Sequence, residues 1–184
     1  MSIVISILLP NVGIFLASDH RRTDVNTREY SDDFSKTREV KNNIYFSMTG
    51  YADPGSRLLE KLKATEFETV NSLLEFTEHN FPLIEKLDVV LNGINDEGRL
   101  FVWTKKGKSQ PPNHIVESSQ MALTIAASTD NDYQGHFIHS IRTKDRSDIN
   151  MAIEDSIGET IRYAASLDKA ISPTYDLVFI SKPN

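Results

Sequence analysis

Short runs of apolar, β-branched residues open the chain. Two of them, SIVISILL and VGIFLAS, are too short for typical helices and do not alternate with polar residues, so each predicts a buried strand. Pro10-Asn11 between them is a turn signal and predicts a hairpin, whereas residues 19–33 are polar and loop-like. A second strand pair follows this stretch. The strands predicted here cover residues 2–9, 12–18, 36–40 and 43–49.

A helical pattern begins after Gly50. The segment 51–54 (YADP) resembles a helix start, because proline is tolerated in the first turn. Apolar residues recur at roughly helical spacing until a break at residues 80–82. Further strands are predicted over residues 88–94, 100–104 and 121–127, with residues 110–113 (QPPN) as a loop.

The last part of the chain is helical again from Asp130, and it ends in one more strand over residues 175–180. Ser147-Asp148 makes a good N-cap, and apolar residues then recur every four positions from Ile149. Strands and helices therefore come in separate blocks. This order favours a layered α+β sandwich over a doubly wound parallel sheet. We expect a single domain spanning residues 1–184.

Composition excludes several classes of function. Twenty basic against 26 acidic side chains give a formal charge of −6, which argues against a nucleic-acid partner. The dense basic run at residues 105–108 (KKGK) is interrupted by glycine and predicts a solvated turn. Cysteine is absent, which excludes disulfides and cysteine nucleophiles. Without a long apolar span or the basic region of a secretion signal, we expect a cytoplasmic protein that does not enter a membrane.

Common phosphate-binding, dinucleotide-binding and nucleophile-elbow motifs are also missing from the sequence. Asp132, His136 and His139 could share one face of a helix and hold a metal ion. A plain polar helix face explains them better. We therefore predict no metal and no cofactor.

The strongest candidate chemistry lies at the start of the chain. Removal of Met1 is expected because serine is small, and it would leave Ser2 with a free α-amine. Such a residue carries a nucleophile and a base together, since its amine has a pKa of about 8 and can accept the hydroxyl proton. A nearby cation would lower that pKa, and an acid would hold the cation. Lys36 and Asp19, at the ends of predicted strands, are candidates for these two tasks.

Several segments resemble the β-subunits of proteasomes, within the superfamily of N-terminal-nucleophile (Ntn) hydrolases. The run at residues 16–23 (LASDHRRT) looks like the segment L-A-x-D-x-R-x-T of that family. Residues 33–36 (DFSK) resemble its lysine-bearing strand, and residues 49–53 (TGYAD) resemble its entry into the first helix. The detailed match covers about the first third of the chain, while the order of elements fits over essentially all of it. The resemblance implies a four-layer αββα sandwich with two antiparallel sheets.

The resemblance also implies roles for individual residues. Ser2 falls at the family's N-terminal threonine and would be the nucleophile. Thr23 and Gly50 fall where the backbone pairs with an extended substrate, and Met48 falls where a side chain shapes the primary specificity pocket. Four further positions would support the nucleophile. They are Asp19, Lys36, Ser128 and Asp168.

Two departures from the family leave the function open. The family's Gly-Ser-Gly run is replaced at residues 126–129 (AAST), and its Ser-Gly-Gly loop at residues 170–173 (AISP). The first hypothesis is an N-terminal serine hydrolase of peptides that assembles into homo-oligomers, with a possible separate ATPase unfoldase. The second is a non-catalytic proteasome-like assembly or binding protein. The third is an amidohydrolase acting on a small molecule.

Overall fold

The strands form two antiparallel sheets and a short ribbon in the computed structural model, which describes residues 2–24, 26–127, 129, 131–145 and 147–183. The first sheet contains Ile3–Leu9 (β1), Gly13–Asp19 (β2), Ala122–Ala127 (β10) and Tyr175–Ser181 (β11). The second contains Thr37–Lys41 (β5), Ile44–Gly50 (β6), Leu87–Ile94 (β7), Leu100–Lys106 (β8) and Asn113–Val116 (β9). Arg22–Thr23 (β3) and Tyr30–Ser31 (β4) form the ribbon. The sheet orders are β10-β1-β2-β11 and β5-β6-β7-β8-β9.

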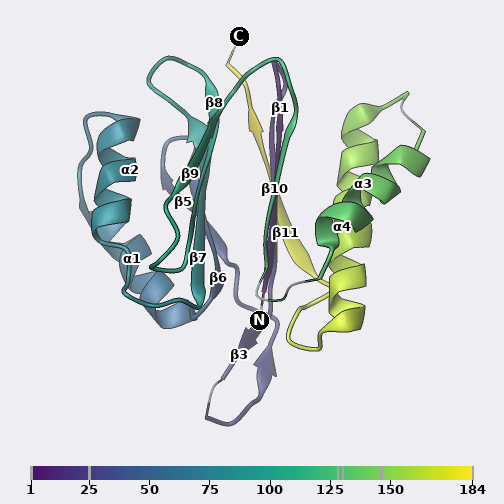
Figure 1. Cartoon of the computed structure of the whole chain (residues 1–184), viewed down its shortest axis with the longest axis horizontal. Coiled ribbons are helices and arrows are strands. Elements are labelled where there is room, and N and C mark those ends of the chain that lie inside the picture. Colours follow the sequence, from purple (N-terminus) through teal and green to yellow (C-terminus); the bar gives the residue numbers. More distant parts are fainter. Residues whose placement is uncertain (1, 25, 128, 130, 146, 184) are drawn as a thin grey trace.

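The helices cover the outer faces of the two sheets. They are Ala52–Ala64 (α1), Val70–His79 (α2), Tyr133–Thr143 (α3) and Ile149–Leu167 (α4). Figure 1 shows α1 and α2 outside the sheet of β5 to β9, and α3 and α4 outside the sheet that contains β1. The layers therefore run helix, sheet, sheet, helix. The predicted four-layer αββα sandwich is confirmed.

Both faces of the first strand, β1, are buried, which explains why its sequence is apolar at nearly every position. Ile3, Ile5 and Ile7 pack toward the layer of α3 and α4, together with Phe137, Ile153 and Ile157. Val4 and Leu8 point the other way and pack between the two sheets. Since side chains alternate along a strand, a central strand covered on both faces needs apolar residues at nearly every position.

Some elements differ from the sequence prediction. The ribbon of β3 and β4 lies within the stretch predicted as loop, and β9 begins at Asn113, also predicted as loop. These strands have only two to four residues, too few for an alternating pattern. The helical region after Gly50 is two helices, because the chain leaves the first at Thr65 and a capping box at Thr69 starts the second.

The prediction of a solvated turn at residues 105–108 is wrong for Lys105. This residue belongs to β8 and is only 7% exposed. Its ammonium donates to the backbone carbonyls of Lys108 and Gln110, and it lies 5.5 Å from the centre of the Phe81 ring. A lysine can extend its aliphatic stem along apolar surface and keep its charge satisfied at the tip. The turn itself begins only at Gly107, where φ is 55°.

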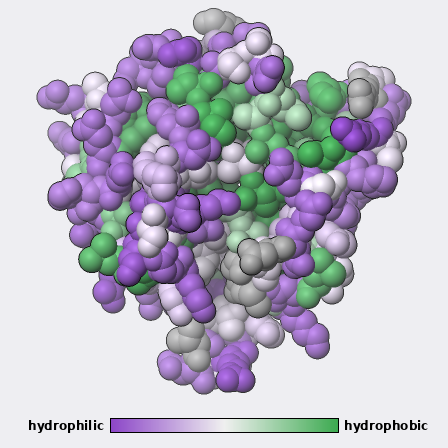
Figure 2. Space-filling model, in the orientation of Figure 1, coloured by the Kyte–Doolittle hydropathy of each residue, from purple (hydrophilic) through white to green (hydrophobic). Residues whose placement is uncertain are grey.

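The distribution of hydrophilic and hydrophobic residues on the surface corresponds to the layers of the sandwich. In Figure 2, hydrophilic residues cover much of the flank over α1 and α2, while hydrophobic residues are visible nearer the middle, where the strands lie. Over the described part of the chain, none of the helices has the length and hydropathy needed to cross a membrane.

Candidate active site

Asp19 ends β2 and is completely buried. Its Oδ1 accepts a hydrogen bond of 2.8 Å from the backbone N–H of Ile3, the residue next to Ser2. Its Oδ2 accepts from the backbone N–H groups of Arg21, at 3.1 Å, and Ser172, at 3.2 Å. One carboxylate therefore ties the first strand, the end of the second strand and the loop after α4 together.

Lys36 lies just before β5 and pairs with this carboxylate. Its Nζ is 2.7 Å from Asp19 Oδ2 and donates to the Asp19 backbone oxygen at 3.0 Å. The side chains are 5% and 0% exposed, so the ion pair is shielded from water. Burial lowers the pKa of Lys36, and the attraction of Asp19 opposes this effect only in part. The sequence-predicted partners are thus in direct contact.

Ser2 precedes β1 and is 3% exposed. It is an even number of residues from Val4 and Leu8, which pack between the sheets. Because side chains alternate along a strand, the Ser2 side chain is directed toward that same layer. Since Asp19 binds the amide of Ile3, the ion pair with Lys36 sits one residue from the predicted nucleophile. The three residues that the sequence singled out converge at the end of the sandwich where β1 begins.

Thr23 lies in the ribbon of β3 and β4, and Gly50 is the last residue of β6. Thr23 pairs with Tyr30, and its hydroxyl is buried without a hydrogen-bond partner among the described residues. Gly50 is exposed and has a φ of 89°, a conformation that disfavours other residues. A Cβ there would lie 2.1 Å from the Lys86 carbonyl oxygen. The chain therefore needs glycine at this position, whether or not a substrate pairs with it.

Met48 is buried on the opposite face of β6 from the layer between the sheets. It belongs to the core under α1 and α2, and its sulfur would meet any side chain added at Gly55 of α1. Its predicted part in a specificity pocket stays a prediction.

Comparisons with known proteins identify the architecture. No protein-family profile and no curated protein matches the sequence. Among solved structures, Anbu (ancestral beta-subunit) from Yersinia bercovieri superposes with a TM-score of 0.73 at 12% identity, over 97% of this chain and 81% of Anbu. Eukaryotic HslV from Trypanosoma brucei gives 0.63 at 14% identity, over 97% and 99% of the two chains. This chain has the proteasome-type Ntn-hydrolase fold. At such identities the likeness shows the fold alone.

Two further residues were predicted to support the nucleophile in this proteasome-type fold. Ser128 lies outside the described residues. Asp168 caps the end of α4, and its Oδ1 accepts from the Ala170 N–H at 2.9 Å. Its Oδ2 is buried and has no hydrogen-bond partner within the described ranges. The turn that Asp168 holds leads to Ser172, whose N–H reaches Asp19, so Asp168 shapes the loop beside the site.

Sequence reasoning missed a buried row of hydroxyls next to the ion pair. Thr37 follows Lys36 and donates to Ser18 Oγ at 2.9 Å, and its Oγ1 lies 2.8 Å from Ser47 Oγ. These three residues come from β2, β5 and β6, so the row bridges the two sheets of the proteasome-type fold. Ser172, also missed, is fully buried. A weak signal was available for Ser18, the one hydroxyl residue of its largely apolar strand, but not for Ser47, which shares its strand with Tyr45 and Thr49.

The possible metal ligands on α3 have other contacts. Asp132 accepts the Gly135 N–H at 2.7 Å as the helix N-cap, and His136 stacks on Tyr163 with ring centroids 4.1 Å apart. His139 is exposed. No group of three or more potential metal ligands comes together in the part of the chain that the structure describes.

Proposed function

We propose that this chain is an N-terminal serine hydrolase that cleaves amide bonds, with peptides as its substrates. The observation that carries the proposal is the buried ion pair of Asp19 and Lys36, joined to the amide of Ile3. A buried ion pair contributes little to stability compared with apolar packing, because both charges lose their hydration. Its position one residue from Ser2 is therefore better explained by chemistry at Ser2.

The proposed reaction starts once Met1 is removed. The α-amine of Ser2 takes the hydroxyl proton as Ser2 Oγ bonds to the substrate carbonyl carbon. The amine then returns that proton to the leaving nitrogen as the C–N bond breaks, which leaves an ester on Ser2. Water hydrolyses the ester by the same steps and restores the hydroxyl.

The ion pair would tune this reaction through its charge. The ammonium of Lys36 disfavours protonation of a nearby amine and so favours its neutral, basic form. Asp19 orients Lys36 and keeps its charge compensated. Backbone N–H groups near Gly50 are proposed to stabilise the oxyanion, which is commonly worth about 10²–10³ in rate. Thr23 and Gly50 are proposed to pair with an extended substrate, and Met48 to favour an apolar residue next to the scissile bond.

One observation favours a non-catalytic assembly or binding protein instead. Ser2 is almost fully buried in the chain that includes Met1, so a retained Met1 would leave no accessible nucleophile. Homo-oligomeric assembly, a cytoplasmic location and a separate ATPase partner belong to the proposal under either function. Hydrolysis of a small amide is the remaining alternative, and it uses the same nucleophile and base.

The experiment begins with the intact mass of untagged protein made in a host with methionine aminopeptidase. A mass lacking one methionine is expected. A fluorophosphonate probe should then modify Ser2, located by peptide mapping, and peptidase activity should follow the same residue. Ser2→Ala should lose both signals and Ser2→Thr should retain hydrolysis, because threonine also carries a hydroxyl beside the amine.

Three results would decide against the proposal or narrow it. Quantitative retention of Met1 would remove the nucleophile-base pair and support the assembly protein. Equal activity of Ser2→Ala would place any hydrolysis elsewhere. Turnover of small amides without turnover of peptides would support the amidohydrolase.

A further inference from the structure

The strand β11 is one edge of the first sheet, and it pairs with β2 in a single unbroken register over seven residues. Just before the strand, the carbonyl oxygen of Thr174 accepts the backbone N–H of His20. Just after it, the backbone N–H of Lys182 donates to the carbonyl oxygen of Val12. Since backbone groups alternate along a strand, the even-numbered residues direct theirs toward β2 and the odd-numbered residues direct theirs outward.

The outward backbone groups of β11 are available for pairing. They belong to Tyr175, Leu177, Phe179 and Ser181. Within the described part of the chain, none of these N–H or C=O groups is hydrogen-bonded to another protein group. The side chains of Leu177 and Phe179 are also 37% and 45% exposed, and no other large apolar side chain described in the two sheets is as open to water. A partner strand would cover both kinds of group.

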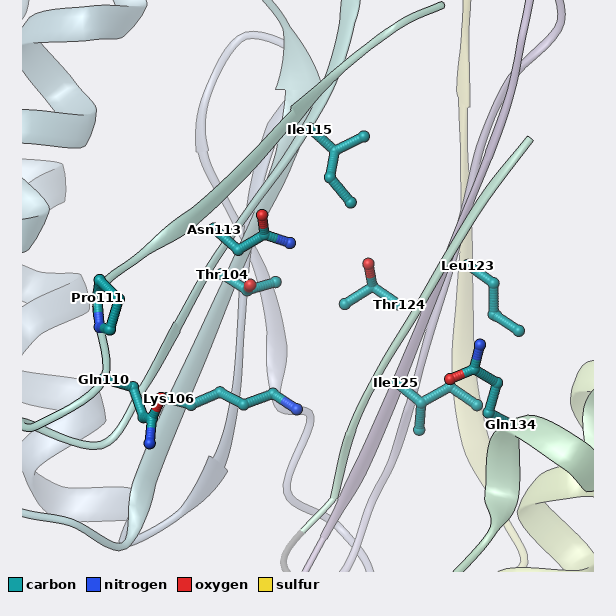
Figure 3. A pocket seen from close by; sticks show the side chains of 10 residues that line it. All are labelled: Thr104, Lys106, Gln110, Pro111, Asn113, Ile115, Leu123, Thr124, Ile125 and Gln134. Carbon is teal, nitrogen blue, oxygen red and sulfur yellow. The ribbon is translucent and has the colours of Figure 1, made fainter. Parts of the chain in front are cut away.

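The other sheet edges are less suited to pairing. On the same side of the sandwich, β5 has a bulge between Glu39 and Lys41 and is rich in charge. On the opposite side, β9 has only four residues, and polar side chains such as Asn113 and Thr124 line the hollow between β9 and β10 (Figure 3). Short length, charge and bulges are the usual means by which edge strands stay unpaired. The long, regular β11 has a single charged residue, Asp176.

We propose that β11 pairs with β11 of a second copy of this chain, antiparallel and centred on Val178, so that the first sheets of two copies become one continuous sheet. In this register Leu177 lies opposite Phe179 of the second copy, and Tyr175 lies opposite Ser181 of the second copy. Each such pair exchanges two backbone hydrogen bonds, so all the outward groups find partners. The contact of Leu177 with Phe179 also covers the two exposed apolar side chains.

The charges at the two ends of β11 favour the antiparallel arrangement. Asp176 and Lys182 lie on the same face, since they are an even number of residues apart. Antiparallel pairing brings Asp176 of one copy diagonally toward Lys182 of the other, whereas parallel pairing would bring like charges together. Each has a partner in its own chain at 2.8 Å, His20 for Asp176 and Glu117 for Lys182. The charges therefore orient the two strands, and the backbone and apolar contacts hold them. This surface serves the homo-oligomeric assembly proposed above and is independent of hydrolysis.

A disulfide test locates the centre of the pairing. The chain has no cysteine, so Val178→Cys introduces one thiol, directly opposite the same thiol of the second copy. The two Cα atoms of such a pair are about 4.5 Å apart, within the range that a disulfide spans. Mild oxidation should link most of this variant into covalent dimers. Ser181→Cys is the control, since it is exposed on the same strand but faces Tyr175, and it should remain mostly unlinked. Equal or faster linking of Ser181→Cys would show random collision and overturn the proposal.

Sedimentation of the full chain tests the backbone pairing. Leu177→Pro removes an outward N–H and leaves the bonds to β2 in place, so it should fold but associate at least about tenfold more weakly. Leu83→Ser, which removes a side chain 86% exposed in the loop after α2, should associate like the parent chain. An oligomer that Leu177→Pro leaves unchanged and Val178→Cys does not link would overturn this surface alone. A parent chain that stays monomeric at all concentrations would overturn both this surface and the proposed assembly.

Discussion

Two buried lysines illustrate the difference between a structural group and a candidate functional one. Lys105 is 7% exposed, and its ammonium is held by two backbone carbonyls and the face of Phe81. The side chain of Lys36 is 5% exposed and is held by the carboxylate of Asp19. Burial is nearly the same. Of the two, only Lys36 is paired with a full negative charge, so only its region holds a buried ion pair.

The partners of the two ammonium groups lead to different parts of the fold. The carbonyls around Lys105 belong to the turn that follows its own strand, so its hydrogen bonds are local. Asp19 instead binds backbone groups of Ile3, Arg21 and Ser172, which are far apart in the sequence. A change at Lys105 should therefore disturb one turn, whereas a change at the ion pair should disturb the whole end of the sandwich.

The largest effect is expected from Asp19→Ala. This substitution leaves Lys36 buried without a counter-charge and leaves three backbone N–H groups without their acceptor. Removing one partner of a buried pair typically destabilises a protein by about 3–5 kcal/mol. Urea unfolding followed by circular dichroism measures the change. A loss below about 1 kcal/mol would mean that water reaches the pair and screens its charges.

Lys36→Met and Lys105→Met make the comparison direct, since each replaces a buried ammonium by an apolar chain of similar length. Lys36→Met should abolish amide hydrolysis and destabilise the fold by about 2 kcal/mol, because Asp19 keeps its backbone donors but loses its cation. Lys105→Met should reduce stability by about 1 kcal/mol and leave hydrolysis unchanged. Amide hydrolysis assays and urea unfolding of both variants measure the two effects. Equal losses of activity would end the distinction between the two regions.

The sequence predicted those parts of the fold in which neighbouring residues all favour the same element. The structure confirms the strands predicted from the apolar runs of β1 and β2, and the N-cap at Asp148. Burial on both faces requires apolar residues at nearly every position, and helix capping favours a few residue types, so both can be recognised from the local sequence. The short strands β3, β4 and β9 have no comparable sequence pattern. They are strands because of their pairing with neighbouring strands.

The candidate site was predictable in outline for a different reason. Spacing along the chain placed Asp19 and Lys36 near the first strand, and the structure brings them into contact. Ser172 could not be found in this way, since it contributes a backbone N–H and any residue except proline supplies one. The hydroxyl row of Ser18, Thr37 and Ser47 depends on how two sheets meet, which no local pattern encodes.

A smaller effect is expected from Thr37→Val, which keeps the shape of the side chain and removes the hydroxyl between the sheets. Two hydrogen bonds are lost and the hydroxyls of Ser18 and Ser47 remain buried, so a loss of about 1–2 kcal/mol is expected. Hydrolysis should fall because Thr37 fixes the backbone next to Lys36. Thr37→Ser restores the hydroxyl and should recover both properties. If Thr37→Ser is as damaged as Thr37→Val, packing of the methyl group matters and the hydroxyl row does not.

The smallest effect is the pH dependence of the ion pair. Because burial lowers the pKa of Lys36 below its ordinary value of 10.5, the unfolded chain binds more protons than the folded one between those two values. The stability of the parent chain relative to Lys36→Met should therefore rise as pH increases through that interval. Urea unfolding of both proteins from neutral pH upward measures this difference and cancels the titration of the other lysines. A difference that falls with pH would show instead that the attraction of Asp19 outweighs burial and raises the pKa of Lys36. The ammonium would then stay charged at every pH where the α-amine of Ser2 titrates, so the two signs distinguish a cation that can lose its proton from one that cannot.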